Sequence, residues 1–82
     1  MLTELREAAA KAAGAKQVLR AMEAGRAVKV FVAADADIFV TRRIYDECRE
    51  KRIPLVEVAS MKAIGEACGV AVKAAAAAVL RA

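Results

Sequence analysis

Hydrophobic and polar positions at the start of the chain follow a helical pattern that glycines interrupt. Residues 3–12 begin with Thr3, which is suited to N-capping, and continue with strong helix formers, so we expect a helix there. The pattern stops at Gly14 and resumes over residues 16–24. Gly25 then favours a left-handed helix end. Two helices in succession are therefore predicted.

The middle of the chain alternates strand and helix patterns. Residues 28–33 are mostly β-branched or aromatic with a single charge, which is typical of a strand covered on both faces. From 38 to 51 apolar residues recur among charges at helical spacing. Residues 53–58 are again short and β-rich, with a tolerable proline near the start, and residues 61–68 follow as a helix between Ser60 and Gly69. This order predicts parallel strands joined by a right-handed crossover.

The final stretch, residues 70–80, carries two conflicting signals. Five consecutive alanines at 74–78 favour a helix by propensity, whereas the valines and the leucine around them favour a strand. Small side chains suit a strand that helices cross at short range, so we expect a strand at about 74–80. The predicted fold is an α/β, single-domain, three-layer α/β/α sandwich with a small mixed sheet, covering residues 1–82.

Composition limits the protein to one modest domain with a core of small side chains. The chain has 82 residues, of which 60% are hydrophobic, but alanine dominates and only two Phe, one Tyr and no Trp are present. No apolar run approaches the roughly 20 residues that cross a bilayer, and the start does not resemble a secretory signal. We therefore expect a cytoplasmic protein. A net charge of +4 and a pI near 9.4 favour a polyanionic partner without identifying one.

The residues needed for most catalytic and metal chemistry are missing from the sequence. There is no histidine and only one serine, which argues against Ser-His-Asp and Cys-His catalysis. Cys48 and Cys68 form no CxxC pair, so we expect buried free thiols, no metal and no cofactor. Asp35 and Asp37 follow a predicted strand, where they could hold a metal or a phosphoryl group, but loop and N-cap carboxylates are favoured. The sequence therefore predicts no enzyme.

The second predicted helix has a charged side and an apolar side. Lys16 and Arg20 are four residues apart and share a face, with Gln17 about 100° round the helix. Val18, Leu19 and Met22 lie on the opposite side, and Lys11 and Arg26 extend the positive charge. Gly14 is expected to let another backbone approach closely, and the helix N-terminus can attract an anion. A solvated helix face and an anion-binding surface both fit this pattern.

Three segments occur in the order and spacing of one known family: GAKQVLRA at 14–21, VFVAADAD at 30–37 and IGEACGV at 64–70. Over essentially its whole length the chain resembles the kink-turn-binding ribosomal proteins of the L7Ae and L30e type, and especially the short bacterial YbxF-like members. The resemblance implies a monomeric, non-enzymatic protein that stabilises kink-turns in structured RNA, either ribosomal or riboswitch-like. A non-catalytic protein-interaction module with a basic surface is the alternative.

The resemblance also implies which residues contact RNA. The start of the second helix would enter the widened major groove of the kink, with Lys16 and Gln17 where archaeal and eukaryotic members carry an Asn-Glu pair. Arg20 matches a basic position on the groove and phosphate side. A second surface after Gly69 would pack against a base turned out of the kink, with Asp37 and the Met61-Lys62 pair nearby. The implied RNA-binding residues are Gly14, Ala15, Lys16, Gln17, Arg20, Asp37, Lys62, Val70, Ala71 and Val72.

Overall fold

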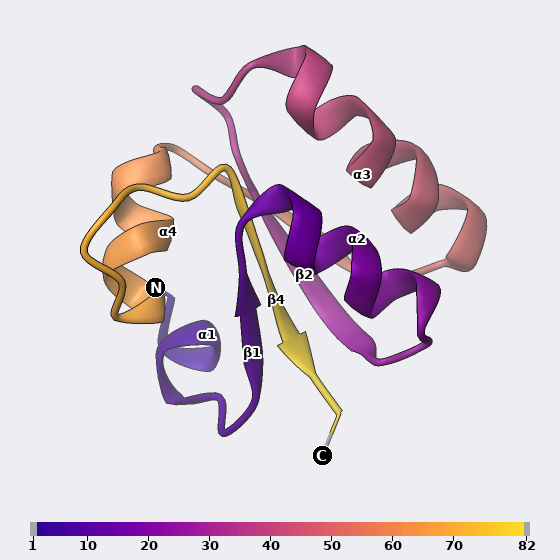
Figure 1. Cartoon of the computed structure of the whole chain (residues 1–82), viewed down its shortest axis with the longest axis horizontal. Helices are drawn as coiled ribbons and strands as arrows, with labels where there is room; N and C mark the ends of the chain where they lie inside the picture. Colours follow the sequence, from indigo (N-terminus) through magenta and orange to yellow (C-terminus); the bar gives the residue numbers. More distant parts are fainter. Residues whose placement is uncertain (1, 82) are drawn as a thin grey trace.

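Helices cover both faces of a central sheet in the computed structural model, which describes residues 2–81. Helices α1 and α4 lie on one face, and α2 and α3 lie on the other (Figure 1). The described elements are α1 (Thr3–Glu7), β1 (Lys11–Ala13), α2 (Ala15–Glu23), β2 (Ala27–Ala33), α3 (Ile38–Lys51), β3 (Leu55–Val58), α4 (Met61–Cys68) and β4 (Ala76–Leu80). The predicted three-layer α/β/α sandwich is confirmed. Within residues 2–81 no helix has the length and apolar character that crossing a bilayer requires.

The sheet is mixed, and its strands lie in the order β1-β4-β2-β3. Strands β2 and β3 are parallel, with Val30 opposite Leu55, as the strand-helix-strand pattern predicts. Strand β4 is antiparallel to both of its neighbours. Its residue Ala78 lies opposite Ala12 of β1 on one side and opposite Val30 of β2 on the other. The last strand in the chain is therefore central in the sheet.

The N-terminal segment differs from the prediction. The expected helix over 3–12 ends at Glu7, and Lys11–Ala13 instead form the edge strand β1. Strand pairing with β4 overrides the helix propensity of the alanines, and Ala12 is buried by it. The Lys11 ammonium supports the new helix end by donating to the carbonyl oxygens of Leu5 (3.3 Å) and Arg6 (3.0 Å).

Strand β2 supplies both halves of the core. Val30 and Val32 pack with α2 and α3, whereas Phe31 and Ala33 pack with α1 and α4. All four side chains are buried, which confirms a strand covered on both faces from Val30 onward. Strand β4 begins at Ala76 rather than at residue 74. Its three alanines, 76–78, are fully buried between the helix layers, so they are not available as a docking face for a partner.

The two cysteines are free and differ in burial. Cys48 lies in the core, whereas Cys68 is only partly buried, so the prediction of buried thiols holds fully for Cys48 alone. Burial raises the pKa of both thiols; the charge of Glu47 adds to this at Cys48, and that of Lys11 opposes it at Cys68. Both side chains behave as small hydrophobic groups at neutral pH.

Candidate functional site

Four segments that are far apart in the sequence meet at one edge of the sheet, which we call the upper edge: residues 14–17, 34–39, 59–62 and 73–75. Three backbone hydrogen bonds attach these segments to the ends of neighbouring strands, from Gly14 N to the Ala76 oxygen (2.8 Å), from Ala33 N to the Ala75 oxygen (2.9 Å), and from Ala34 N to the Val58 oxygen (2.7 Å). Helices α2, α3 and α4 all begin at this edge (Figure 1). Their N-terminal amides therefore give it a partial positive potential.

Helix α2 presents its polar side to solvent at the upper edge. Lys16, Gln17 and Arg20 are exposed, whereas Val18 and Met22 are buried against the sheet, as the spacing predicts. No side chain caps the helix at Gly14, so its first amide groups are left without a side-chain partner. This end of α2 is suited to a ligand that carries hydrogen-bond acceptors.

Gly14 has a conformational role and not the packing role that we expected. Nothing within 4 Å would meet a Cβ at this position, so packing within the chain does not require a glycine here. Its φ of +98° is instead a conformation that residues with a Cβ rarely adopt. That conformation lets the chain leave β1 and begin α2 directly.

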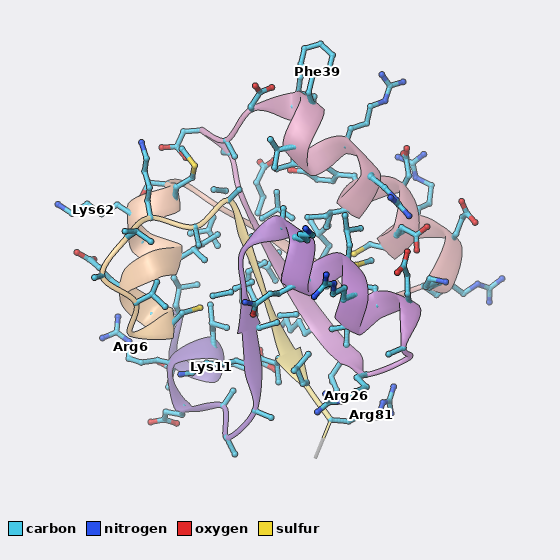
Figure 2. The ribbon with its side chains drawn as sticks, in the orientation of Figure 1. Arg6, Lys11, Arg26, Phe39, Lys62 and Arg81 are labelled. Carbon is cyan, nitrogen blue, oxygen red and sulfur yellow. The ribbon has the colours of Figure 1, made fainter. Side chains whose placement is uncertain are left out.

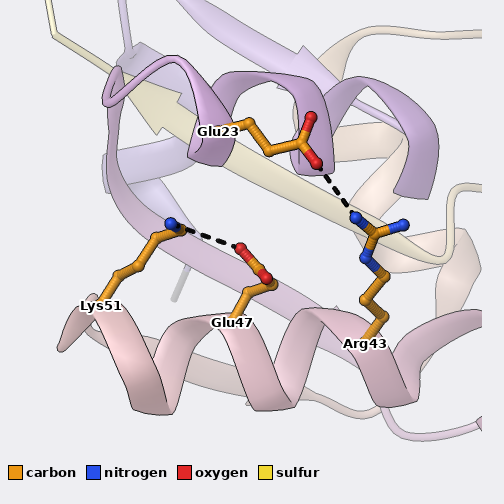
Figure 3. A network of polar contacts seen from close by, with 4 residues as sticks. All are labelled: Glu23, Arg43, Glu47 and Lys51. Atoms are coloured by element: carbon orange, nitrogen blue, oxygen red, sulfur yellow. Dashed lines mark hydrogen bonds and ion pairs between the residues drawn. The ribbon is translucent and has the colours of Figure 1, made fainter.

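Ion pairs on the neighbouring helix leave the cations of α2 free. Arg43 of α3 donates to the Glu23 carboxylate at 3.0 Å, and Lys51 lies 3.6 Å from Glu47 (Figure 3). Glu23 is thereby engaged away from the exposed face of α2. Among the described residues, neither Lys16 nor Arg20 is in an ion pair, so their charges are available to an anionic ligand.

Asp35 and Asp37 act as caps for two different helices. The Asp37 carboxylate accepts a hydrogen bond from Phe39 N (2.9 Å) at the start of α3, and the Asp35 carboxylate accepts one from Met61 N (2.9 Å) at the start of α4. This arrangement matches the interpretation of the two residues as loop and N-cap carboxylates. Within residues 2–81 no group of three potential metal-ligating side chains is found.

The loop from Gly69 to Ala75 runs back along α4 and carries exposed apolar side chains. Ala74 N donates to the Met61 oxygen (3.1 Å), and at Gly65 a Cβ would collide with the Val72 carbonyl oxygen. Gly65 therefore allows α4 and the loop to pack closely. Val72 is 71% exposed and Val70 is 39% exposed, so neither valine belongs to the core.

Lys62 is also exposed near this loop, whereas Met61 is partly buried. Ser60 caps α4 by accepting from Ala63 N (3.1 Å), and Gly69 ends the helix in the left-handed conformation, as the sequence predicts. Lys62 thus projects from the first turn of a well-fixed helix. Figure 2 shows it pointing away from the body of the molecule.

An exposed aromatic side chain at the upper edge is absent from the sequence-based site. Phe39, in the first turn of α3, is 87% exposed and points away from the molecule (Figure 2), and Ile38 is 58% exposed. The sequence does contain a signal for this exposure. Thr41, Ile44 and Cys48 recur at helical spacing and form the buried side of α3, and Phe39 does not lie on that side. The upper edge therefore combines cations with exposed apolar surface.

Comparisons with known proteins find similarity over most or nearly all of the chain. The model of the "Ribosomal protein L7Ae/L30e/S12e/Gadd45 family" matches residues 2–82. An "RNA-binding protein" of Geobacillus thermodenitrificans and the "RNA-binding protein YbxF" of Geobacillus stearothermophilus are each 43% identical over 68 residues, which is 83% of this chain and 83% of the relative. The solved structure titled "Giardia lamblia 15.5kD RNA binding protein" is 30% identical with a TM-score of 0.86, covering 99% of this chain and 68% of that one.

Proposed function

Because the chain belongs to the ribosomal protein L7Ae/L30e/S12e/Gadd45 family, we propose that it is an RNA-binding protein and that it stabilises kink-turns in structured RNA. Membership of this family also agrees with the expectation that the protein is not an enzyme. The observation that carries the proposal is the upper edge, where cations of α2 that form no ion pair with any described residue lie on the same edge as the exposed apolar side chains of α3.

The dimensions of an α-helix explain why the target is a bent RNA. An α-helix with its side chains is about 10–12 Å across, and the major groove of regular A-form RNA is too deep and narrow for side chains to read. A kink opens that groove. The first amides of α2, which follow Gly14, and the side chains of Lys16 and Gln17 then reach base edges that a straight duplex would hide, together with the phosphates beside them.

The chemistry of the α2 face matches guanine. Guanine presents the O6 and N7 acceptors in the major groove, and both Lys16 and Arg20 are hydrogen-bond donors. The Gln17 amide both donates and accepts, so it can pair with either partner of a sheared G·A pair. The exposed valines at 70 and 72 offer an apolar surface to a base that the kink turns outward.

The protein would act by shifting a conformational equilibrium. A flexible RNA samples bent and extended states, and a ligand that binds the bent state more tightly raises its population in proportion to that difference in affinity. No chemical step is required. The expected product is a kinked RNA held by a rigid α/β scaffold.

The test is a titration of the protein into a doubly labelled RNA duplex that carries a kink-turn. A second duplex has its G·A pairs replaced by Watson–Crick pairs. We expect a saturable rise in energy transfer for the kink-turn only. Lys16→Ala or Arg20→Ala should weaken binding by about 1–3 kcal/mol if a bidentate base contact is lost.

Arg49→Ala is the matched control, because Arg49 is an exposed cation near the far end of α3. It removes the same charge without touching the upper edge. Equal binding of the protein to both duplexes would contradict kink-turn recognition. Equal losses in the α2 variants and in the control would contradict the assignment to α2.

A further inference from the structure

A basic hollow lies along α2, between the upper edge and the end of β4. This cavity of about 360 Å³ is bounded by α2, β1, the turn after α2 and the end of β4. Its charged and amide lining consists of Lys11, Gln17, Arg20 and Arg26, and none of the carboxylates within residues 2–81 lines it. We call this feature the basic hollow.

The arginines of the basic hollow are its anion-binding groups. The Lys11 ammonium is directed to the last carbonyls of α1, at 3.3 Å and 3.0 Å, so it contributes charge but is occupied. Arg20 and Arg26 take part in no ion pair among residues 2–81. The nearest acid along α2, Glu23, is paired with Arg43 (Figure 3). Among the residues that the structure describes, these two guanidinium groups therefore have no counter-charge.

The end of β4 holds the backbone of the turn at Gly25 and Arg26 and places a further cation beside that turn. Arg81 N donates to the Arg26 oxygen (2.8 Å), and its guanidinium Nε donates to the Gly25 oxygen (2.9 Å). Figure 2 shows Arg26 and Arg81 together where β4 ends. The backbone of the turn is thus held on both sides, which reduces the entropy that a ligand would have to remove.

The physical chemistry of such a cluster favours a phosphate. Guanidinium groups crowded without a carboxylate repel one another, and an anion between them removes that repulsion and gains charge-assisted hydrogen bonds. The guanidinium fork matches phosphate geometry. Because Gln17 and Arg20 belong both to the hollow and to the exposed face of α2, the hollow is continuous with the proposed RNA surface.

We propose that the basic hollow binds a backbone phosphate of the same RNA, in the duplex that flanks the recognised site. This inference rests on the proposed function and adds a contact to it. Lys16 and Gln17 recognise the bent site, whereas Arg26, with Arg20, holds a phosphate of the flanking duplex, which both test RNAs contain. A phosphate contact carries no sequence information, so it raises affinity without changing selectivity.

The test measures binding of Arg26→Gln to the kink-turn and to its Watson–Crick counterpart at several salt concentrations. Loss of one phosphate contact should reduce the slope of log K against log salt by about 0.7–0.9. At about 0.1 M salt the same relation gives a loss on the order of five- to eightfold. We expect this loss on both RNAs, so that their affinity ratio stays constant. Arg26→Lys should keep most of the salt slope, because it keeps the charge.

Arg49→Gln is again the matched control, and circular dichroism checks that each variant is folded. Neutral methylphosphonate linkages placed singly along the RNA should locate the phosphate, because the correct one abolishes the difference between the parent protein and Arg26→Gln.

If Arg26→Gln binds like the control while Arg20→Ala binds more weakly, the hollow is not a phosphate site and the proposed function stands. A loss of affinity for the kink-turn RNA alone would also contradict the inference, because Arg26 would then take part in recognising the bent site. Failure of the parent protein to distinguish the two RNAs would remove the proposed function and this inference with it.

Discussion

Gly65→Ala should destabilise the protein, although the same change at an open helix position would stabilise it. Gly65 lies inside α4 and is buried, and a Cβ there would overlap the Val72 carbonyl oxygen and approach Lys73 Cα to 3.1 Å. Alanine is favoured over glycine in a helix by about 1 kcal/mol, whereas forcing an extra carbon into a packed site costs about 1–3 kcal/mol. The difference between the buried and the open position is therefore about 1–3 kcal/mol.

The comparison requires a reference position in the same helix. Glu66 is exposed, so the variants Glu66→Ala and Glu66→Gly measure the intrinsic preference for alanine over glycine in α4. Urea unfolding followed by far-ultraviolet circular dichroism gives the free energy of unfolding for each variant. With slopes of about 1–3 kcal/mol per molar urea, the expected difference moves the midpoint by up to a few molar.

The result that refutes this reasoning is simple to recognise. If Gly65→Ala is stabilised by as much as alanine over glycine at position 66, then α4 and the loop are not in close contact. If α4 and the loop are in close contact, the Gly65→Ala variant can relieve the overlap only by moving Val72. Under the proposed function, the affinity of this variant for a kink-turn should then fall as well. The salt slope attributed to Arg26 should not change, because that group lies by the turn after α2, away from this loop.

Three further predictions concern single side chains. Phe31→Ala should lower the free energy of unfolding by about 3–5 kcal/mol, whereas Phe39→Ala should change it by less than about 0.5 kcal/mol, because the two rings are 3% and 87% exposed; equal effects in urea unfolding would contradict this assignment of core and surface. Asp37→Ala should cost about 0.5–2 kcal/mol by removing the cap of α3, and Asp37→Asn should retain most of the stability in a thermal melt, because an amide oxygen still accepts from Phe39 N. The pKa of Tyr45 is raised above its ordinary value of 10.0, first by burial and then by its hydrogen bond to Glu57. The folded state therefore keeps this proton longer than the unfolded state, so stability is lost as the pH rises from 10 through the folded pKa. Glu57→Gln should lower that pKa in an ultraviolet titration of tyrosinate, and an unchanged titration would show that the carboxylate has no influence.

Elements that carry a strong local pattern were predictable from the sequence. Helix α3 has its apolar residues at helical spacing, and β2 is a short β-branched run, so each was placed within a residue of its observed bounds. The family resemblance was likewise confirmed by the family model that matches residues 2–82. These signals lie in the local sequence or in short motifs, so they can be recognised without knowledge of the tertiary contacts.

The prediction was wrong for the segment whose structure depends on pairing with a distant strand. Residues 8–12 have the composition of a helix, and only pairing with β4, more than sixty residues later, makes Lys11–Ala13 a strand. Strand β4 shows the same override, because its alanines favour a helix in isolation. It was placed correctly only because a layered core needs a strand of small side chains at that position.

The site was predictable where charge and spacing define a face. Lys16, Gln17 and Arg20 are exposed as expected, because the apolar side of α2 is unambiguous. Phe39 was missed, although the helical spacing of the core residues of α3 leaves it off the buried side. Arg81 was missed because only the path of β4 brings it to the turn at Gly25.

The central position of β4 has a consequence for how the protein is made. Synthesis proceeds from the N-terminus at about 5–20 residues per second, and β4 is the last described element to leave the ribosome. Until then, β1 has no described strand to pair with, and β2 has an open edge beside an uncovered apolar surface. The sheet can therefore close only after β4 has been made, when a segment of alanines that favours a helix in isolation pairs as a strand between β1 and β2. A variant that slows this insertion should aggregate during expression even if the finished protein is stable.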